Sequence, residues 1–200
     1  DDNMTVSEAT VTRRKNNRIR QFHHHAFRTD DMEKTRKFWE DILGCPLIGT
    51  FVETTDPVTE EPSNYIHAFF ELGDGTALAF FQFQEGLYKP TAIKGPQDPF
   101  DHHIALEVES KEAVFDFRDK LEEKGYEHML IDHGYCYSIY MHDPNGMQVE
   151  LTTRVPETDD IMERHAKTAH EDLEKWLAGV TEANNKYRKL RKQEAEASAE

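Results

Sequence analysis

Three side chains of metal-binding type occur at matching places in the sequence. His24 opens the segment His24–Arg28, and His103 opens the similar segment His103–Glu107, while Glu150 follows within a later apolar–polar alternation. Two imidazoles and one carboxylate form the 2-His-1-carboxylate set, which binds a divalent metal and leaves positions open for other ligands. The sequence therefore predicts a metal site made of His24, His103 and Glu150.

An internal duplication explains why the two histidines match. Each begins a short strand that is followed by an amphipathic helix, and each helix ends at a glycine and is followed by further strands. The first helix is predicted over Asp31–Leu43, and the second begins after a Ser110 cap and ends at Lys124. Each half-chain therefore reads as strand, helix and three strands.

The alternation of side chains along a strand places the three donors on equivalent faces. Successive strand residues point to opposite sides of a sheet. Phe27 must pack on the following helix, so His24 faces away from that helix. In the second module Leu106 packs on the helix in the same way, so His103 faces away from it. Glu150 alternates with apolar neighbours and also faces away, so a curved sheet would bring the donors together. The neighbouring histidines His23, His25 and His102 are predicted either to be structural or to support the ligands from outside the ligand set.

Composition limits the class of protein. The 200 residues suit one domain with extensions, and the net charge of −15 argues against a nucleic-acid partner. No run approaches the roughly 18 apolar residues that span a bilayer, and no signal-peptide core is present near the N-terminus. The two cysteines, Cys45 and Cys136, form no CxxC pair, which favours a reducing cytoplasm. We expect a cytoplasmic protein without a membrane partner.

The chain divides into three parts by composition. Residues 1–19 are predicted to be a mobile N-terminal arm, and residues 20–153 a domain with modules at 20–84 and 100–153. Residues 154–200 are predicted to be a helical tail. The tail carries an apolar stripe that needs a packing or dimer surface: Ile161, Ala169, Leu173, Trp176 and Leu177.

These motifs resemble the vicinal-oxygen-chelate superfamily, the group of glyoxalases, bleomycin-resistance proteins and extradiol dioxygenases. The matching pieces are His24–Asp31, Phe38-Trp39, His103–Val108 and the Asp143–Gly146 turn that precedes Glu150; the turn is the most specific of them. The resemblance covers about residues 20–153. It implies an α+β fold in which two βαβββ modules form an open, cup-shaped mixed sheet around a divalent metal. It also implies a homodimer.

The duplication bears on the number of protein ligands. Gly146 precedes Glu150 by four residues, and Gly75 precedes Ala79 by the same interval. Glyoxalase I and related epimerases have a fourth donor near that position, and alanine cannot coordinate a metal. Three protein ligands are therefore favoured, with Glu71 and Gln82 as alternative donors if the register differs.

A three-ligand site with open positions suits Fe(II) that holds a catechol and dioxygen together. The resemblance implies that Tyr140, in the strand before the Asp-Pro turn, donates a hydrogen bond to a substrate oxygen. His133 is predicted to act as the acid/base, with His67 as the alternative proton carrier. We therefore expect an Fe(II)-dependent extradiol-type dioxygenase of aromatic-compound degradation, acting on a catechol- or hydroquinone-like aromatic and O2. Mn(II), Zn(II) and Ni(II) remain alternative metals.

Two other function classes remain open. The same His24, His103 and Glu150 set could serve a redox-neutral glyoxalase- or epimerase-like lyase or isomerase, or a fosfomycin-type transferase. A metal-free binding protein of the bleomycin-resistance kind is the third interpretation, and the presence of the ligand set argues against it. Oxygen uptake separates the first class from the second.

Overall fold

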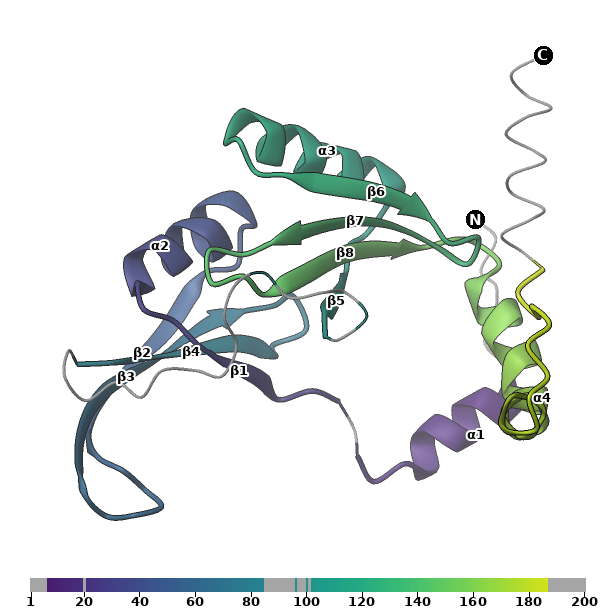
Figure 1. The fold of residues 1–200 in the computed structure, drawn as a ribbon, viewed down its shortest axis with the longest axis horizontal. Coiled ribbons are helices and arrows are strands. Elements are labelled where there is room, and N and C mark those ends of the chain that lie inside the picture. The colour runs from purple at the N-terminus through teal and green to yellow at the C-terminus, as the bar shows by residue number, and fades with distance from the viewer. Residues whose placement is uncertain (1–6, 20, 85–95, 97–99, 101, 187–200) are drawn as a thin grey trace.

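The structure is a computed structural model that describes residues 7–19, 21–84, 96, 100 and 102–186 (Figure 1). Expectations for 1–6, 20, 85–95, 97–99, 101 and 187–200 lie outside the described residues. In chain order the helices and strands are α1 (Glu8–Asn16), β1 (His24–Arg28), α2 (Met32–Arg36), η1 (Lys37–Ile42), β2 (Leu47–Thr55), β3 (Pro62–Glu71), β4 (Ala77–Phe83), β5 (Ile104–Glu107), α3 (Lys111–Glu123), β6 (His128–Asp132), β7 (Cys136–His142), β8 (Gln148–Arg154) and α4 (Thr158–Leu177).

The predicted α+β fold with two repeated modules is confirmed. Two open, four-stranded sheets have the same order, β1-β4-β3-β2 and β5-β8-β7-β6, and in each the first strand pairs in parallel while the others pair antiparallel. The register also repeats, because Ala26 pairs with Ala79 in the first sheet and Ala105 pairs with Glu150 in the second. Ala79 therefore occupies the position equivalent to Glu150, as the glycine spacing predicts.

The first helix differs from the single α-helix expected over 31–43. Asp31 caps α2 by accepting a hydrogen bond from the Lys34 amide at 2.9 Å, but the helix then widens into the π-helical segment η1. The amide of Leu43 donates to the Phe38 carbonyl at 3.0 Å, a bond five residues long that sequence periodicity does not reveal. Within η1, Phe38 and Trp39 are both fully buried.

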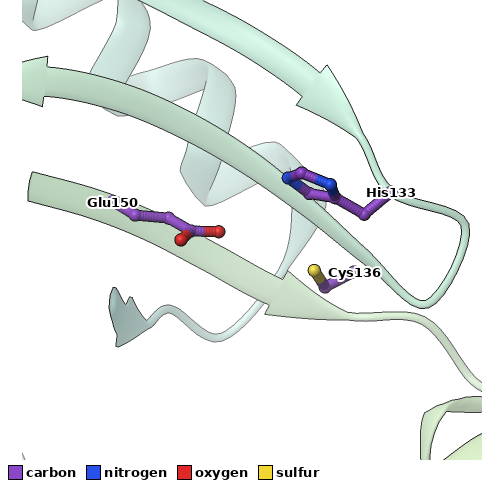
Figure 2. A group of neighbouring side chains, drawn as sticks. All are labelled: His133, Cys136 and Glu150. Carbon is purple, nitrogen blue, oxygen red and sulfur yellow. The ribbon is translucent and has the colours of Figure 1, made fainter. Parts of the chain in front are cut away.

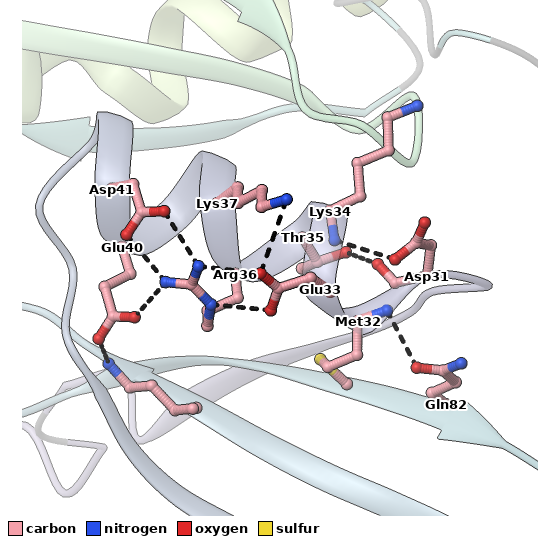
Figure 3. A network of polar contacts seen from close by, with 11 residues as sticks. Asp31, Met32, Glu33, Lys34, Thr35, Arg36, Lys37, Glu40, Asp41 and Gln82 are labelled. Carbon is pink, nitrogen blue, oxygen red and sulfur yellow. Dashed lines mark hydrogen bonds and ion pairs between the residues drawn. The ribbon is translucent and has the colours of Figure 1, made fainter.

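An ion-pair network spans the junction of α2 and η1 (Figure 3). The guanidinium of Arg36 donates to Glu33, Glu40 and Asp41 at 2.8–3.0 Å. The Arg36 hydrogen bond holds the pKa of Glu33 below its usual range. Glu40 also accepts from the Leu47 amide at 3.0 Å, which ties the end of the helix to β2.

One hydrophobic core joins the two modules. It collects the helix-facing side chains of both sheets, such as Phe70 and Phe80 from the first and Ile139 and Leu151 from the second. Apolar residues of η1 and α3 complete it. The faces of the sheets that pack on the helices are therefore the faces through which the modules meet.

The Asp143–Gly146 turn is part of this junction. Asp143 is buried, and its carboxylate accepts hydrogen bonds from the amides of Asn145 and Met147 and from the Trp39 indole at 3.3 Å. The Asn145 side chain donates to Thr35 at 3.1 Å. The turn of the second module thus binds the first helix of the first module.

Helices lie at both ends of the described chain. The segment expected to be an N-terminal arm contains α1, which lies near α4 (Figure 1). Arg14 of α1 pairs with Asp159 of α4 at 3.7 Å. Helix α4 confirms the predicted helical tail up to Leu177, but residues 180–186 form no helix. Of its stripe, Ile161 is buried, while Trp176 is 64% exposed. None of the helices in the described part of the chain has the length and apolar character needed to cross a membrane.

Candidate metal centre

Glu150 is a buried carboxylate on the face of the second sheet that points away from the helix. Its neighbours Val149 and Leu151 are anchored in the core, so the alternation of β8 turns Glu150 to the other side. The side chain is only 5% exposed. A buried carboxylate needs partners, and Ser138 Oγ donates to its Oε1 at 2.5 Å while His103 Nε2 lies 3.1 Å from its Oε2.

The spacing of His103 and Glu150 suits a shared cation. Ligand atoms that bind one metal at about 2.1 Å and at right angles lie about 3 Å apart. The His103–Glu150 separation of 3.1 Å is close to that value. Two of the three predicted ligands are therefore brought together within one module.

Tyr140 and His133 lie beside this pair. Tyr140 is paired with Glu150 across β7 and β8, and the His133 Nε2 lies 2.9 Å from the Tyr140 hydroxyl. The ring of His103 lies 6.1 Å from that of Tyr140. Burial, followed by the charge of Glu150, raises the pKa of Tyr140, so its phenol stays protonated and can donate a hydrogen bond.

A tight turn between β6 and β7 positions His133. The His133 amide donates to the Cys136 carbonyl at 3.0 Å, and Gly134 has a φ of +86°, which favours glycine. The turn sets His133 and Cys136 opposite each other, on the face that carries Tyr140. Figure 2 shows His133, Cys136 and Glu150 on this face, and one potential ligand atom from each lies within 4.8 Å of the others.

Sequence reasoning missed Cys136 as a member of this cluster. The signal was the alternation of β7, in which Cys136, Ser138 and Tyr140 occupy every second position. In the sequence alone, Cys136 indicates only the redox compartment. Its place beside Glu150 depends on the register of β7 with β8, which periodicity alone does not give.

His24 has the predicted orientation but lies on the other sheet. Its ring contacts Phe69 and His67 at centroid distances of 5.6 and 5.9 Å, and its Nδ1 lies 2.8 Å from that of His23. Among the described residues, the group of His133, Cys136 and Glu150 is the one cluster of three such donors, so His24 does not join His103 and Glu150 within the chain. The reason is that the modules meet through their helix-facing sides, as the His25–His102 ring contact of 5.7 Å also indicates.

The remaining candidate residues also lie on the first sheet. His67 stacks on Phe81 at 3.8 Å, and its buried Nε2 has no hydrogen-bond partner in the described part of the chain. Burial, then the charge of His24, lowers the pKa of His67. The Gln82 amide bonds the backbone of Asp30 and Met32, at the start of α2, whereas Glu71 shares the His24 face through its pairing with Ala77.

A separate cavity of about 950 Å³ lies between the modules. It is lined in part by His25, Cys45, His102 and His103, while Glu150, Tyr140 and His133 are not among its lining residues. Among the described residues of the candidate centre named here, His103 lines this cavity.

Comparison with known proteins identifies the family. Residues 21–151 match the model of the Glyoxalase/Bleomycin resistance protein/Dioxygenase superfamily. No curated protein sequence matches the chain significantly.

Solved structures share the fold at low sequence identity. A glyoxalase/bleomycin resistance protein/dioxygenase domain from Frankia sp. EAN1pec has a TM-score of 0.51 and 14% identity, with 68% of this chain and 98% of that chain covered. Lactoylglutathione lyase from Agrobacterium tumefaciens has a TM-score of 0.48 and 17% identity, with 68% and 96% covered. A point mutant of the fosfomycin resistance protein FosX from Listeria monocytogenes, complexed with Mn(II), has a TM-score of 0.47 and 21% identity, with 70% and 96% covered. These likenesses concern the fold alone.

The duplicated modules, their repeated register and the match over residues 21–151 lead to one conclusion: the chain belongs to the glyoxalase/bleomycin resistance protein/dioxygenase superfamily.

Proposed function

We propose that the protein is a metal-dependent enzyme, an Fe(II)-dependent dioxygenase of the extradiol type that cleaves a catechol- or hydroquinone-like aromatic. The observation that carries the proposal is the hydrogen-bonded His133–Tyr140 pair, 2.9 Å apart, on the same sheet face as the His103–Glu150 pair. A ring-cleavage reaction needs a metal site with open positions and a nearby group that moves a proton. The His103–Glu150 and His133–Tyr140 pairs, which lie on one face, could supply these two elements.

The donor set fits a divalent metal such as Fe(II). His103 and Glu150 supply an imidazole and a carboxylate at a separation suited to one ion, and Ser138 orients the carboxylate through its hydroxyl. When bound, Fe(II) supplies a centre that can hold two neighbouring substrate oxygens and activate dioxygen.

The chain's own residues handle the proton. The protonated phenol of Tyr140 donates either to a neutral His133 or to a substrate oxygen. His133 accepts the proton that a catechol hydroxyl releases on binding, and Tyr140 can then accept a hydrogen bond from the charged imidazole. The same imidazole returns the proton to the ring-opened product.

We propose further that His24 is supplied by a second copy of the chain. The His24 face and the Glu150 face both lie outside the shared core. Each also carries an exposed apolar side chain, Phe51 at 56% and Met129 at 51% exposure, which a second copy could cover. A symmetric homodimer in which the two faces meet would complete two equivalent ligand sets.

The first experiment is anaerobic reconstitution with Fe(II), followed by oxygen-electrode recording with a panel of catechols and hydroquinones. Oxygen uptake together with a coloured ring-cleavage product is the expected result. Absence of uptake by protein that holds one Fe(II) per chain would contradict the dioxygenase proposal and favour a redox-neutral isomerase or transferase. Tight binding of aromatics by protein that takes up no metal would instead favour the binding-protein class.

A further inference from the structure

We infer that His133, Cys136 and Glu150 form a second ligand set that binds a thiophilic divalent cation such as Zn(II) or Co(II) through the Cys136 thiolate. This set shares Glu150 with the proposed iron centre but adds a sulfur ligand. It is independent of any oxygen chemistry, since it requires only that the three side chains bind one ion.

The three donors are close enough for one ion after a small adjustment. One ligand atom from each lies within 4.8 Å of the others (Figure 2). In tetrahedral zinc sites the metal lies about 2.3 Å from sulfur and about 2.0–2.2 Å from nitrogen and oxygen, so ligand atoms lie about 3.3–3.7 Å apart. Contraction by about 1 Å, within reach of side-chain rotation, would close the set around a cation.

Backbone hydrogen bonds and strand pairing fix the relative positions of these residues, which favours a built site. The His133–Cys136 hydrogen bond closes the β6–β7 turn, and β7 and β8 hold Cys136 and Glu150 on one face of the sheet. The Cys136 Sγ lies 3.8 Å from the Ser138 hydroxyl, which itself donates to Glu150. The thiol is therefore connected to the buried carboxylate through a single side chain.

The chemistry of the donors selects the class of cation. Thiolate and imidazole together suit Zn(II), Co(II) and similar borderline ions, whereas Mg²⁺ and Ca²⁺ prefer oxygen ligands. An imidazole that binds a cation must be neutral and can no longer accept a proton at the ligating nitrogen. A thiophilic ion bound here would therefore take His133 away from the proton transfer proposed for it.

The test is anaerobic titration of demetallated full-length protein with Co(II) alone, followed by near-ultraviolet absorption. A thiolate ligand to Co(II) gives a charge-transfer band that nitrogen and oxygen ligands do not give. We expect this band to saturate at one Co(II) per chain. It should disappear in Cys136→Ser, with Co(II) affinity at least about tenfold weaker.

Two further variants identify the ligands. Cys45→Ser is the matched control, because Cys45 is the other cysteine, lies in the first module, and has a thiol pKa that burial raises to about 11. Cys45→Ser should keep the band, whereas His133→Ala should weaken it. Circular dichroism identifies any variant that fails to fold, in which case His133→Ala carries the test in place of Cys136→Ser.

Three results would contradict the proposed thiolate site. Co(II) binding without the band, or a band that persists in Cys136→Ser, would overturn the inference, as would loss of the band in a folded Cys45→Ser variant. A normal band in protein that shows no oxygen uptake with Fe(II) would support this site while counting against the proposed dioxygenase function.

Discussion

At the scale of single residues, the centre depends on how Glu150 is held. A carboxylate that is 5% exposed needs polar partners, and Ser138 and His103 meet its two oxygens. The same two contacts fix its orientation toward the open face. A ligand that is ordered before a metal arrives loses less conformational freedom on binding, which favours affinity.

Glu150→Gln tests the role of this carboxylate directly. The amide keeps the size of the side chain but removes the charge, so we expect Fe(II) affinity to fall by more than about 100-fold and nearly all turnover to be lost. Metal analysis after gel filtration and oxygen uptake measure the two effects. Retention of one tightly bound Fe(II) per chain would show that Glu150 is not a ligand.

Tyr140→Phe separates hydrogen bonding from packing. The ring remains, but the partner of His133 and the donor to substrate are removed, so kcat should fall by about 100-fold with little change in KM. Tyr137→Phe is the matched control, since Tyr137 lies on the opposite face of β7 and packs against Phe115. Equal losses in the two variants would assign Tyr140 a structural role only.

At the scale of secondary-structure elements, the sequence predicted which face of its sheet a side chain lies on. It did not predict how the two modules contact each other. Strand alternation correctly placed His24 and Glu150 opposite the helix, and the glycine spacing correctly matched Ala79 with Glu150. The π-helical turn of η1 escaped prediction because its five-residue hydrogen bond leaves no mark on apolar periodicity. The cup around all three donors did not follow either, since alternation does not say which faces two modules use to meet.

The turn between β7 and β8 has a pH-dependent effect on stability. Burial raises the pKa of Asp143, so the folded state holds its proton to higher pH than the unfolded chain, where the pKa is about 3.9. The stability that protonated Asp143 contributes to the folded state is therefore complete below about pH 4. It is lost as pH rises through the pKa of Asp143 in the folded state.

Asp143→Asn tests the direction of this pH dependence. The variant lacks the titrating group, and its amide places a donor near the Trp39 indole or the backbone amides, so we expect it to be less stable by roughly 1–3 kcal/mol at low pH. The difference from wild type should shrink as pH rises from about 4 toward 7. Denaturant unfolding at several pH values measures it, and a pH-independent difference would contradict the assignment.

At the scale of the whole molecule, the shared core is the reason for proposing a second copy. One core inside the chain leaves the His24 face and the Glu150 face on its outside. The end of α4 adds a further exposed apolar surface with Leu173, Trp176 and Leu177. A second copy that covered these surfaces would bury apolar area and supply the missing histidine in the same step.

Subunit mixing decides whether the metal set spans two copies. His24→Ala and Glu150→Gln should each be inactive alone, because each removes one ligand from both sites of a homodimer. In a mixed dimer, one site combines the intact His24 of one copy with the intact Glu150 of the other. Random exchange at equal concentrations should therefore restore about a quarter of wild-type activity. Mass spectrometry of differently tagged copies establishes whether the two variants exchange subunits. If they exchange but the mixture stays inactive, the ligand set does not span two copies.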